Sequence, residues 1–397
     1  MYNRRNYQWA TVMVALLFCM TTACKETATP VVQSCTTATD SLIPLKINIG
    51  KPLNLYLDSM LVIGVQTPVQ YLEKENALLI LDTYGKRLLQ YPLTAADTVT
   101  KPSRAQALHL NYKVMYMHYL NRDSLLLYTY GVFRLSYYNL DTDTVYKTLS
   151  FYDRKIKTNF AFNPAPPNAS NAAPIIFKGN NIIGTGYLMG EHDSEVPAGR
   201  TLFSILHLPD GSLQHKVPYS AIYKTGNWGG SHMRTTYSAY NRQQGTLLLS
   251  LPADHHLQVI DSAWHITNVY AGSRQKLCIS SMPIPKNSPQ LQDPDNALRY
   301  FTNTAAYRDI IYDAYHQHYY RVLQTPPAAA ELNAQQLGEK HATLIAFDNT
   351  FHYLGEGPLP KGLALDNFFV TEQGLYFLNV ANHDQNIGQY VHINPEL

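Results

Sequence analysis

The sequence predicts an all-β fold, and within that class a β-propeller, most simply one of six blades that are each an antiparallel four-stranded sheet. The chain contains 30 tyrosines among many Val, Ile and Thr residues, and 23 prolines and 21 glycines punctuate it. These residue types are typical of strands and tight turns. No long stretch carries the spacing of an amphipathic helix. An internal repeat narrows the prediction to a propeller.

The repeat consists of an apolar strand, a turn that contains aspartate, and a second extended segment. Its first copy is the segment 78–82, which ends at Asp82, followed by the segment 87–91. Later copies carry Asp141, Asp210, Asp261 and Asp348. The intervals are 59, 69, 51 and 87 residues (82 to 141, 141 to 210, 210 to 261, 261 to 348), near the length of a blade with insertions. We expect each carboxylate to cap backbone N–H groups in its turn, so none is assigned to catalysis.

The two ends of the repeat region are expected to meet. The segments 375–378 and 390–393 would form a last blade, and the early strands at 45–49 and 53–65 can pair with it. Such pairing closes the ring without an exposed strand edge. The predicted propeller domain therefore spans 45–397, although seven blades or two β domains remain alternatives because the insertions blur the count.

The N-terminus has the pattern of a lipoprotein signal peptide, predicted over residues 1–23. Arg4 and Arg5 precede an apolar stretch at 11–20, and small residues lead to Cys24. A transmembrane anchor is the alternative, but this stretch is shorter than the roughly 20 residues that a spanning helix needs. Cys24 is therefore the predicted lipidation site, and a lipid-bearing membrane the predicted partner.

Residues 24–44 are predicted to form a lipidated flexible tether, since they are rich in Thr and small residues and lack apolar periodicity. Lys25 and Glu26 directly after Cys24 resemble the charged start that favours surface display in some Gram-negative lipoproteins. Attachment to the outer membrane is our hypothesis, and the periplasmic or surface side stays open. After signal removal and lipidation only Cys35 and Cys278 remain. They either form one disulfide that pins the tether to the fold or stay as two free thiols.

The charge balance excludes one class of partner. Lys and Arg total 31 against 29 Asp and Glu, so the chain has no long basic field to attract nucleic acid. Zinc, phosphate-loop and calcium-loop motifs do not occur in the sequence, and no cofactor or metal is predicted. His316 and His318 are two residues apart, but their setting predicts a hairpin with its turn near Gln317 rather than a metal grip.

An Asn-Trp-Gly-Gly loop is the most unusual local feature. Gly229 and Gly230 permit close approach of a ligand or chain, and the indole of Trp228 offers a flat face with an N–H donor. The loop can stack against a sugar or grip a peptide, or its tryptophan can fill the seam between two blades. Polar residues of the same blade either line the channel or form a satisfied structural network. The candidate binding residues are Asn227, Trp228, Gly229, Gly230, Arg234, Tyr237, Asp254 and His255.

This region also carries a family resemblance. The run 223–230, the segment 234–237 and the segment 250–255 resemble an uncharacterised family of exported six-bladed propeller lipoproteins from Gram-negative envelopes. The resemblance extends from about Leu45 to Leu397. It implies the architecture and the location, and it implies no activity.

The sequence thus favours an exported propeller that binds a glycan, peptide or protein partner without catalysis. The alternative is a periplasmic or surface enzyme, such as a polysaccharide lyase or hydrolase, that uses His255 or His316. A structural component of an envelope complex is the third interpretation. The binding and enzyme interpretations separate by whether a polar, concave channel mouth contains converging His, Arg and carboxylate groups. The structural interpretation predicts instead a broad apolar exposed patch.

Overall fold

The computed structural model describes residues 31–35, 41–93, 99–152, 167–187, 200–275, 278–284, 288, 290 and 293–397. The predicted signal peptide (1–23), the lipidation site Cys24 and much of the predicted tether (24–44) lie outside these residues. Across the described part of the chain, no helix has both the length and the apolar character needed to cross a membrane.

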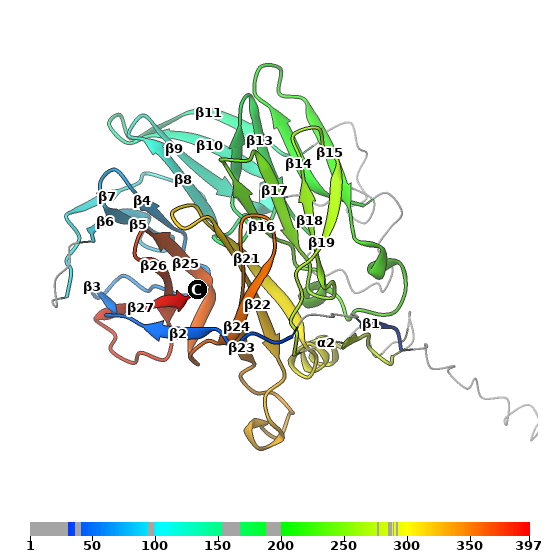
Figure 1. The fold of residues 1–397 in the computed structure, drawn as a ribbon. Coiled ribbons are helices and arrows are strands. Elements are labelled where there is room, and N and C mark those ends of the chain that lie inside the picture. The colour runs from blue at the N-terminus through cyan, green and yellow to red at the C-terminus, as the bar shows by residue number, and fades with distance from the viewer. Residues whose placement is uncertain are drawn as a thin grey trace, which may run out of the picture.

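Six antiparallel sheets are arranged as the blades of a propeller, which confirms the predicted fold class (Figure 1). Blade 1 contains β4 (Val69–Leu72), β5 (Ala77–Asp82), β6 (Arg87–Pro92) and β7 (Arg104–Ala107). Blade 2 contains β8 (Tyr116–Asn121), β9 (Ser124–Thr129), β10 (Arg134–Asn139) and β11 (Thr144–Ser150). Blade 3 contains β12 (Ile176–Lys178), β13 (Asn181–Thr185), β14 (Thr201–His207) and β15 (Leu213–Pro218).

The second half of the ring follows the same plan. Blade 4 contains β16 (Tyr237–Asn241), β17 (Thr246–Ser250), β18 (His256–Ile260) and β19 (Ile266–Tyr270). Blade 5 contains β21 (Ala306–Asp313), β22 (His318–Thr325), β23 (His341–Phe347) and β24 (Tyr353–Pro358). Blade 6 contains β25 (Leu363–Thr371), β26 (Gly374–Asn379) and β27 (Ile387–Glu396).

The ring closes as predicted, because both early strands pair with the last one (Figure 1). Strand β2 (Lys46–Ile49) pairs with the C-terminal part of β27, and β3 (Leu53–Tyr56) pairs with its N-terminal part. The second early strand ends at Tyr56 rather than continuing to residue 65. Joining the two ends of the chain in one sheet leaves blade 6 without a free outer edge at β27.

The first strand of each blade lies at the centre of the ring, where β25 contacts β4, β4 contacts β8, and β21 contacts both β16 and β25. Since the strands alternate in direction, the connections between blades and the turns between second and third strands share one side of the ring. We call this side the mouth face. The turns between first and second strands, and between third and fourth strands, lie on the opposite side, which we call the turn face.

Burial follows the position of a strand within its blade. All six residues of β5 are buried, whereas most residues of the outer strand β11 are exposed. Side chains of neighbouring blades pack together into five apolar clusters, of which the largest joins blades 3, 4 and 5. Each fully buried Leu, Ile or Phe contributes about 1.5 to 3 kcal/mol.

Four of the five turn aspartates cap backbone N–H groups as predicted, and three of these four occupy equivalent turns. Asp210 accepts a hydrogen bond from the backbone N–H of Ser212 at 2.9 Å. Asp261 and Asp348 each accept two backbone N–H groups of their own turns. All three follow the third strand of a blade, so they mark equivalent turns on the turn face.

The other two turn aspartates depart from the repeat. In blade 2 the capping is done by Asn139, which accepts from the N–H groups of Asp141 and Thr142, while Asp141 pairs with Arg122. Asp82 does cap its turn, but it follows the second strand of blade 1 and lies on the mouth face. The interval from 82 to 141 therefore contains a one-strand offset.

Part of the predicted tether is a strand. Strand β1 (Gln33–Cys35) pairs with β20 (Cys278–Ser280) in the connection between blades 4 and 5, and a disulfide joins Cys35 to Cys278. The backbone N–H of Val32 also donates to the hydroxyl of Ser281 at 2.8 Å. Of the two alternatives for these cysteines, the structure has the disulfide, and it ties the segment 31–35 to the mouth face.

Short helices occur in the connections between blades and in the turns between second and third strands. The helix α2 (Pro294–Thr302) begins after Asp293, whose side chain accepts from the N–H of Asp295, and Tyr300 donates its hydroxyl to the carbonyl of Ser280 at 2.8 Å. The 3-10 turns that the described residues cover in full are η1 (Tyr130–Val132), η2 (Ala221–Lys224), η3 (Ser231–Met233) and η5 (Ala329–Glu331).

Candidate functional site

The Asn-Trp-Gly-Gly loop is packed inside the molecule. Trp228 is 1% exposed and belongs to the largest apolar cluster. Its indole N–H donates to the carbonyls of Thr225 at 2.9 Å and Ile222 at 3.1 Å, and its ring lies 6.1 Å from that of Tyr223. This arrangement matches the seam-filling interpretation, and a binding role for Trp228 stays a prediction that its burial disfavours.

The glycines of the loop serve the same packing. Gly229 has φ +67° and Gly230 has φ +82°, a region that favours glycine. A Cβ on Gly229 would lie 2.5 Å from Cδ1 of Tyr300, so this backbone is held against α2. The Asn227 side chain accepts from the Gly229 N–H at 3.0 Å and donates to the carbonyl of Ile284 at 2.9 Å. The three residues thus shape the loop itself.

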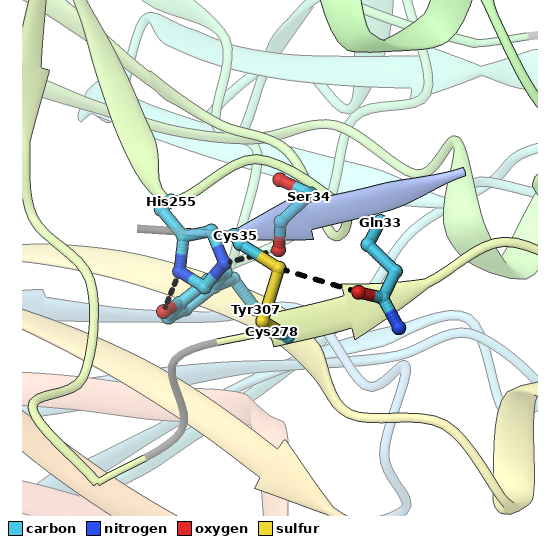
Figure 2. Close-up of a disulfide and its surroundings, with 6 residues drawn as sticks. All are labelled: Gln33, Ser34, Cys35, His255, Cys278 and Tyr307. Atoms are coloured by element: carbon cyan, nitrogen blue, oxygen red, sulfur yellow. Dashed lines mark hydrogen bonds between the residues drawn. A yellow bond between two sulfur atoms is a disulfide. The ribbon is translucent and has the colours of Figure 1, made fainter. Parts of the chain in front are cut away.

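The predicted site residue His255 holds the N-terminal strand (Figure 2). Its Nε2 lies 2.8 Å from the carbonyl oxygen of Ser34, and its Nδ1 lies 2.7 Å from the hydroxyl of Tyr307. A neutral imidazole satisfies both contacts by donating at Nε2 and accepting at Nδ1. Burial lowers the pKa of His255 to about 4, and Arg321 lowers it as well, against the opposing effect of the Ser34 carbonyl.

A buried arginine that the sequence prediction missed fixes the turn that carries His255. The guanidinium of Arg321 donates to the backbone carbonyls of Asp254 at 2.8 Å and His255 at 3.0 Å, and it lies 3.8 Å from the ring centroid of Tyr307. The Asp254 carboxylate in turn accepts from the backbone N–H of His256 at 2.9 Å. Arg234 is also buried, at 1% exposure. Asp254 and His255 are therefore parts of a structural network.

Tyr237 is the predicted site residue that reaches the channel. The central channel opens on the mouth face as a cavity of about 240 Å³. Its wall combines residues 65–68 before β4, 168–171 before β12 and 235–237 at the start of β16 with Tyr187 and Asp366. The polar side chains that line it are Gln66, Asn168, Ser170, Asn171, Tyr187, Thr235, Thr236, Tyr237 and Asp366.

Two bulged inner strands deliver charged groups to this mouth. The pairing of β21 with β22 shifts between Tyr307 and Ile310, and that of β25 with β26 shifts between Ala364 and Phe368. The residues inside these irregularities include Arg308 on β21. Bulges re-aim side chains and occur next to functional sites more often than elsewhere.

The charged groups of the two bulges contact one another. Arg308 donates through Nη2 to Oδ1 of Asp366, and its guanidinium carbon lies 5.3 Å from the ring centroid of Tyr237. The Asp366 side chain is 30% exposed, whereas that of Arg308 is 15% exposed. The Asp366 carboxylate therefore lines the cavity, and the less exposed guanidinium of Arg308 fixes its position.

A second carboxyl group lies beneath this pair. Asp309 is 0% exposed, its Oδ2 lies 3.5 Å from Nε of Arg308, and neither oxygen has a hydrogen-bond partner within the described residues. Burial raises the pKa of Asp309, and Asp366 raises it further, against the opposing effect of Arg308. Asp309 therefore keeps its proton to higher pH than an exposed aspartate does.

The mouth is preorganised by contacts between blades. Asn171 accepts from the backbone N–H of Val69 at 3.1 Å and donates to the carbonyl of Thr67 at 3.0 Å, joining the approach to β12 with blade 1. The hydroxyls of Thr185 and Ser238 lie 2.9 Å apart, joining blades 3 and 4. Burial raises the pKa of Tyr187, so this phenol remains a hydrogen-bond donor at neutral pH.

Metal ligands do not gather in the part of the chain that the structure describes, where no group of three or more His, Cys, Asp and Glu side chains can hold an ion. The rings of His316 and His318 are stacked 6.5 Å apart beside the predicted hairpin turn, and Nδ1 of His316 lies 2.8 Å from Oδ2 of Asp313. Asp313 also accepts from the backbone N–H groups of Tyr315 and His316, so Asp313 caps this turn on the turn face.

Fold and site together define a six-bladed β-propeller with a polar channel mouth on the side of the inter-blade connections. The family model described as a domain of unknown function (DUF4221) matches residues 113–358, which is more than half of the chain. The chain therefore belongs to this family, which confirms the resemblance seen in the sequence.

Solved structures support the same architecture. A member of the DUF4221 family from Bacteroides vulgatus superposes with a TM-score of 0.72 at 18% identity, covering 89% of this chain and 99% of that one. A protein from Bacteroides fragilis whose name calls it exported superposes with a TM-score of 0.50 at 9% identity, covering 90% of this chain and 98% of that one. At these identities the likeness shows the fold alone. A search of the curated proteins finds no match.

Proposed function

We propose that this protein is a lipid-anchored propeller of the cell envelope that binds a saccharide at the channel mouth without catalysing a reaction. The observation that carries the proposal is the convergence of hydroxyl, amide and carboxylate groups from several blades on one cavity, with Asp366 held by Arg308. Sugar hydroxyls both donate and accept hydrogen bonds, which matches side chains such as Tyr237, Thr235 and Asn168.

The size of the cavity favours a compact ligand. Its volume of about 240 Å³ is below the roughly 300 to 1,000 Å³ of sites that enclose drug-sized molecules. One sugar residue at the end of a glycan is a better match than an extended peptide, which needs a longer groove. The phenol rings of Tyr187 and Tyr237 offer apolar surface beside their hydroxyls, as a sugar ring requires.

A binding screen of the full chain in non-ionic detergent tests this proposal, with mono- and disaccharides, peptides and metal ions in one panel. We expect a saccharide to bind, and we expect Asp366→Asn and Tyr237→Phe to weaken that binding. Glu75→Gln, on an exposed side chain of the turn face, is the matched control and should leave it unchanged. Peptide binding alone, or saccharide binding that ignores both mouth substitutions, would overturn the proposal.

Polysaccharide cleavage is a second candidate, and Asp309 is the observation that favours it. A buried carboxyl group whose pKa is raised by burial and by a second carboxylate is an arrangement that enzymes use to separate acid from base. Incubation with a polysaccharide panel, followed by assays for new reducing ends and unsaturated uronides, tests this candidate. Product that disappears in Asp309→Asn would favour the enzyme, whereas a panel without product would favour pure binding.

The lipid anchor and the outer-membrane location are also proposals, supported by the sequence around Cys24. Cys24→Ser should abolish lipid labelling and release the protein from the membrane fraction, whereas Cys35→Ser should leave labelling unchanged. A wild-type protein without lipid would contradict the anchor. Protease treatment of intact cells would then distinguish the surface from the periplasmic side.

A further inference from the structure

The turn face carries a second and larger cavity, of about 450 Å³. It lies where the turns between first and second strands of three successive blades meet. Tyr315 comes from the β21–β22 turn, Glu372 from the β25–β26 turn, and Glu73 from the β4–β5 turn. We call this cavity the turn-face pocket. It lies on the opposite side of the ring from the channel mouth, so an inference about it goes beyond the proposed function.

One wall of the turn-face pocket is a fixed stack of rings. The ring of Tyr376 lies between those of Phe369, with centroids 4.9 Å apart, and His392, with centroids 4.7 Å apart. Its hydroxyl donates to the Gln373 side chain at 3.0 Å. The Tyr71 hydroxyl likewise donates to the Asn76 side chain at 3.0 Å. These contacts hold the rings in place before any ligand arrives, which lowers the entropic cost of binding.

The rim of the turn-face pocket is acidic. Glu73 and Glu372 are both exposed, and both carboxylates raise the pKa of Tyr315 and of Tyr71, in addition to the larger effect of burial. The pKa of Tyr315 rises to about 12. The negative potential of the two carboxylates therefore extends over both phenol rings. Lys51 also lines the pocket, so the lining carries two carboxylates against one ammonium group.

We propose that the turn-face pocket binds an alkylammonium group. A cation over the face of a tyrosine ring is attracted by the π electrons, and aromatic cages of this kind recognise quaternary ammonium groups. The carboxylates of Glu73 and Glu372 supply the opposite charge at the rim, and the pocket is large enough to enclose a trimethylammonium head. In this proposal the cation lies against the rings of Tyr71 and Tyr315, which line the pocket together with Tyr376.

Choline and its neutral isostere 3,3-dimethylbutan-1-ol are the probes that test the proposal, titrated calorimetrically against the full chain in non-ionic detergent. The two probes have the same shape and differ in charge. We expect choline to bind about tenfold more tightly than the isostere, which is the size of effect that a partly desolvated cation–π contact gives. Equal binding of both probes, or no binding of choline, would overturn the proposal.

Matched variants distinguish the site from a general charge effect. Glu73→Gln should weaken choline binding several-fold, while Glu75→Gln, two residues along the same turn but outside the pocket lining, should not. Tyr315→Ala should weaken it further, whereas Tyr84→Ala, an exposed tyrosine elsewhere, should not. Equal losses from Glu73→Gln and Glu75→Gln would contradict the assignment.

Asp366→Asn separates this inference from the proposed function. It changes the channel mouth on the other face, so choline binding should stay unchanged while saccharide binding weakens. A loss of choline binding in Asp366→Asn would place the cation at the mouth instead and would overturn the assignment to the turn-face pocket.

Discussion

The Asn-Trp-Gly-Gly loop shortly precedes residues 235–237 of the channel mouth in the chain, yet the loop and the mouth differ in how far they are exposed to solvent. Trp228 is 1% exposed and both acceptors of its indole N–H are backbone carbonyls, whereas the Asp366 side chain is 30% exposed and faces a cavity. The loop is conspicuous in the sequence and closed in the structure. The mouth is inconspicuous in the sequence and open in the structure.

The difference teaches what unusual local sequence reports. Two glycines beside a tryptophan mark a place where the backbone must take positive φ values and approach another element closely, here Tyr300 of α2. A site built by several blades leaves no such local mark, because each blade contributes one or two ordinary residues. Burial and convergence, rather than rarity, therefore separate a packing feature from a binding feature.

The largest expected effect tests the packing of the Asn-Trp-Gly-Gly loop. Trp228→Ala should lower the free energy of unfolding by about 3 to 5 kcal/mol, the range for removing a large buried aromatic side chain. Urea unfolding measures it, with Tyr84→Ala, whose side chain is 79% exposed, as the control that should change little. A Trp228→Ala protein as stable as the wild type would mean that the loop is not packed as described.

Lowering the pH should decrease the free energy of unfolding through protonation of His255. Its pKa is lowered to about 4 in the folded state, against about 6.5 when unfolded. As the pH falls through this window, the unfolded chain takes up a proton that the folded protein refuses, so stability present above about pH 6.5 is lost, by about 3 kcal/mol in total.

The pH dependence of unfolding in the wild type and in His255→Gln checks this prediction. The variant should lose less stability than the wild type between pH 7 and about pH 4.5, while other groups, such as His118 with its pKa also lowered to about 4, act equally in both. Identical pH profiles would show that His255 is not held neutral between Tyr307 and Ser34.

Removing the disulfide should lower the free energy of unfolding by somewhat less than Trp228→Ala does. Cys35 and Cys278 are 243 residues apart, so their bond restricts the unfolded chain over a long loop, and typical native disulfides contribute about 2 to 4 kcal/mol. Cys278→Ser should lower stability by about this amount and increase hydrogen exchange at β1. Unchanged exchange at residues 33–35 would indicate that His255 and the β20 pairing hold the strand without the disulfide.

The smallest effect sharpens the role of the glycines. Gly229 and Gly245 have nearly equal φ values, +67° and +68°, but a Cβ on Gly245 meets nothing within 4 Å, whereas one on Gly229 meets Tyr300. Substitution by Ala should therefore cost about 1 to 2 kcal/mol of backbone strain at either position, with an additional loss at Gly229. If both Ala variants lose the same stability in thermal unfolding, Tyr300 does not restrict the residue at position 229 sterically.

Much of the fold follows from the sequence, because apolar strands and capped turns are local patterns. The repeat predicts strands in every blade. Asp82, however, follows the second strand of its blade and not the third, and the sequence does not show this difference because a capped turn has the same pattern on either face of the ring. The pairing of β2 and β3 with β27 was also predicted, as the ring would otherwise leave an open edge. The sequence does not decide whether Cys35 and Cys278 form a disulfide, because the distance between them depends on the whole fold.

The candidate site was predicted less well. Tyr237 was included, but Arg308, Asp309 and Asp366 were missed, because they come from different blades and meet only in three dimensions. A weak signal exists: Arg308 and Asp309 interrupt an apolar strand between Tyr307 and Ile310, and Asp366 similarly interrupts β25. Charged residues inside a predicted inner strand therefore indicate a bulge that faces the channel.

The most direct test of the central claim compares the two regions in one titration. The saccharide identified by the screen is titrated against the wild type, Asp366→Asn and Trp228→Phe, the last of which keeps an aromatic ring in the packed seam. We expect Asp366→Asn to lose about tenfold or more in affinity, as for the loss of a hydrogen bond to a charged group, while Trp228→Phe loses stability and keeps its affinity. Full affinity in Asp366→Asn together with lost affinity in Trp228→Phe would contradict the assignment of the ligand site to the channel mouth.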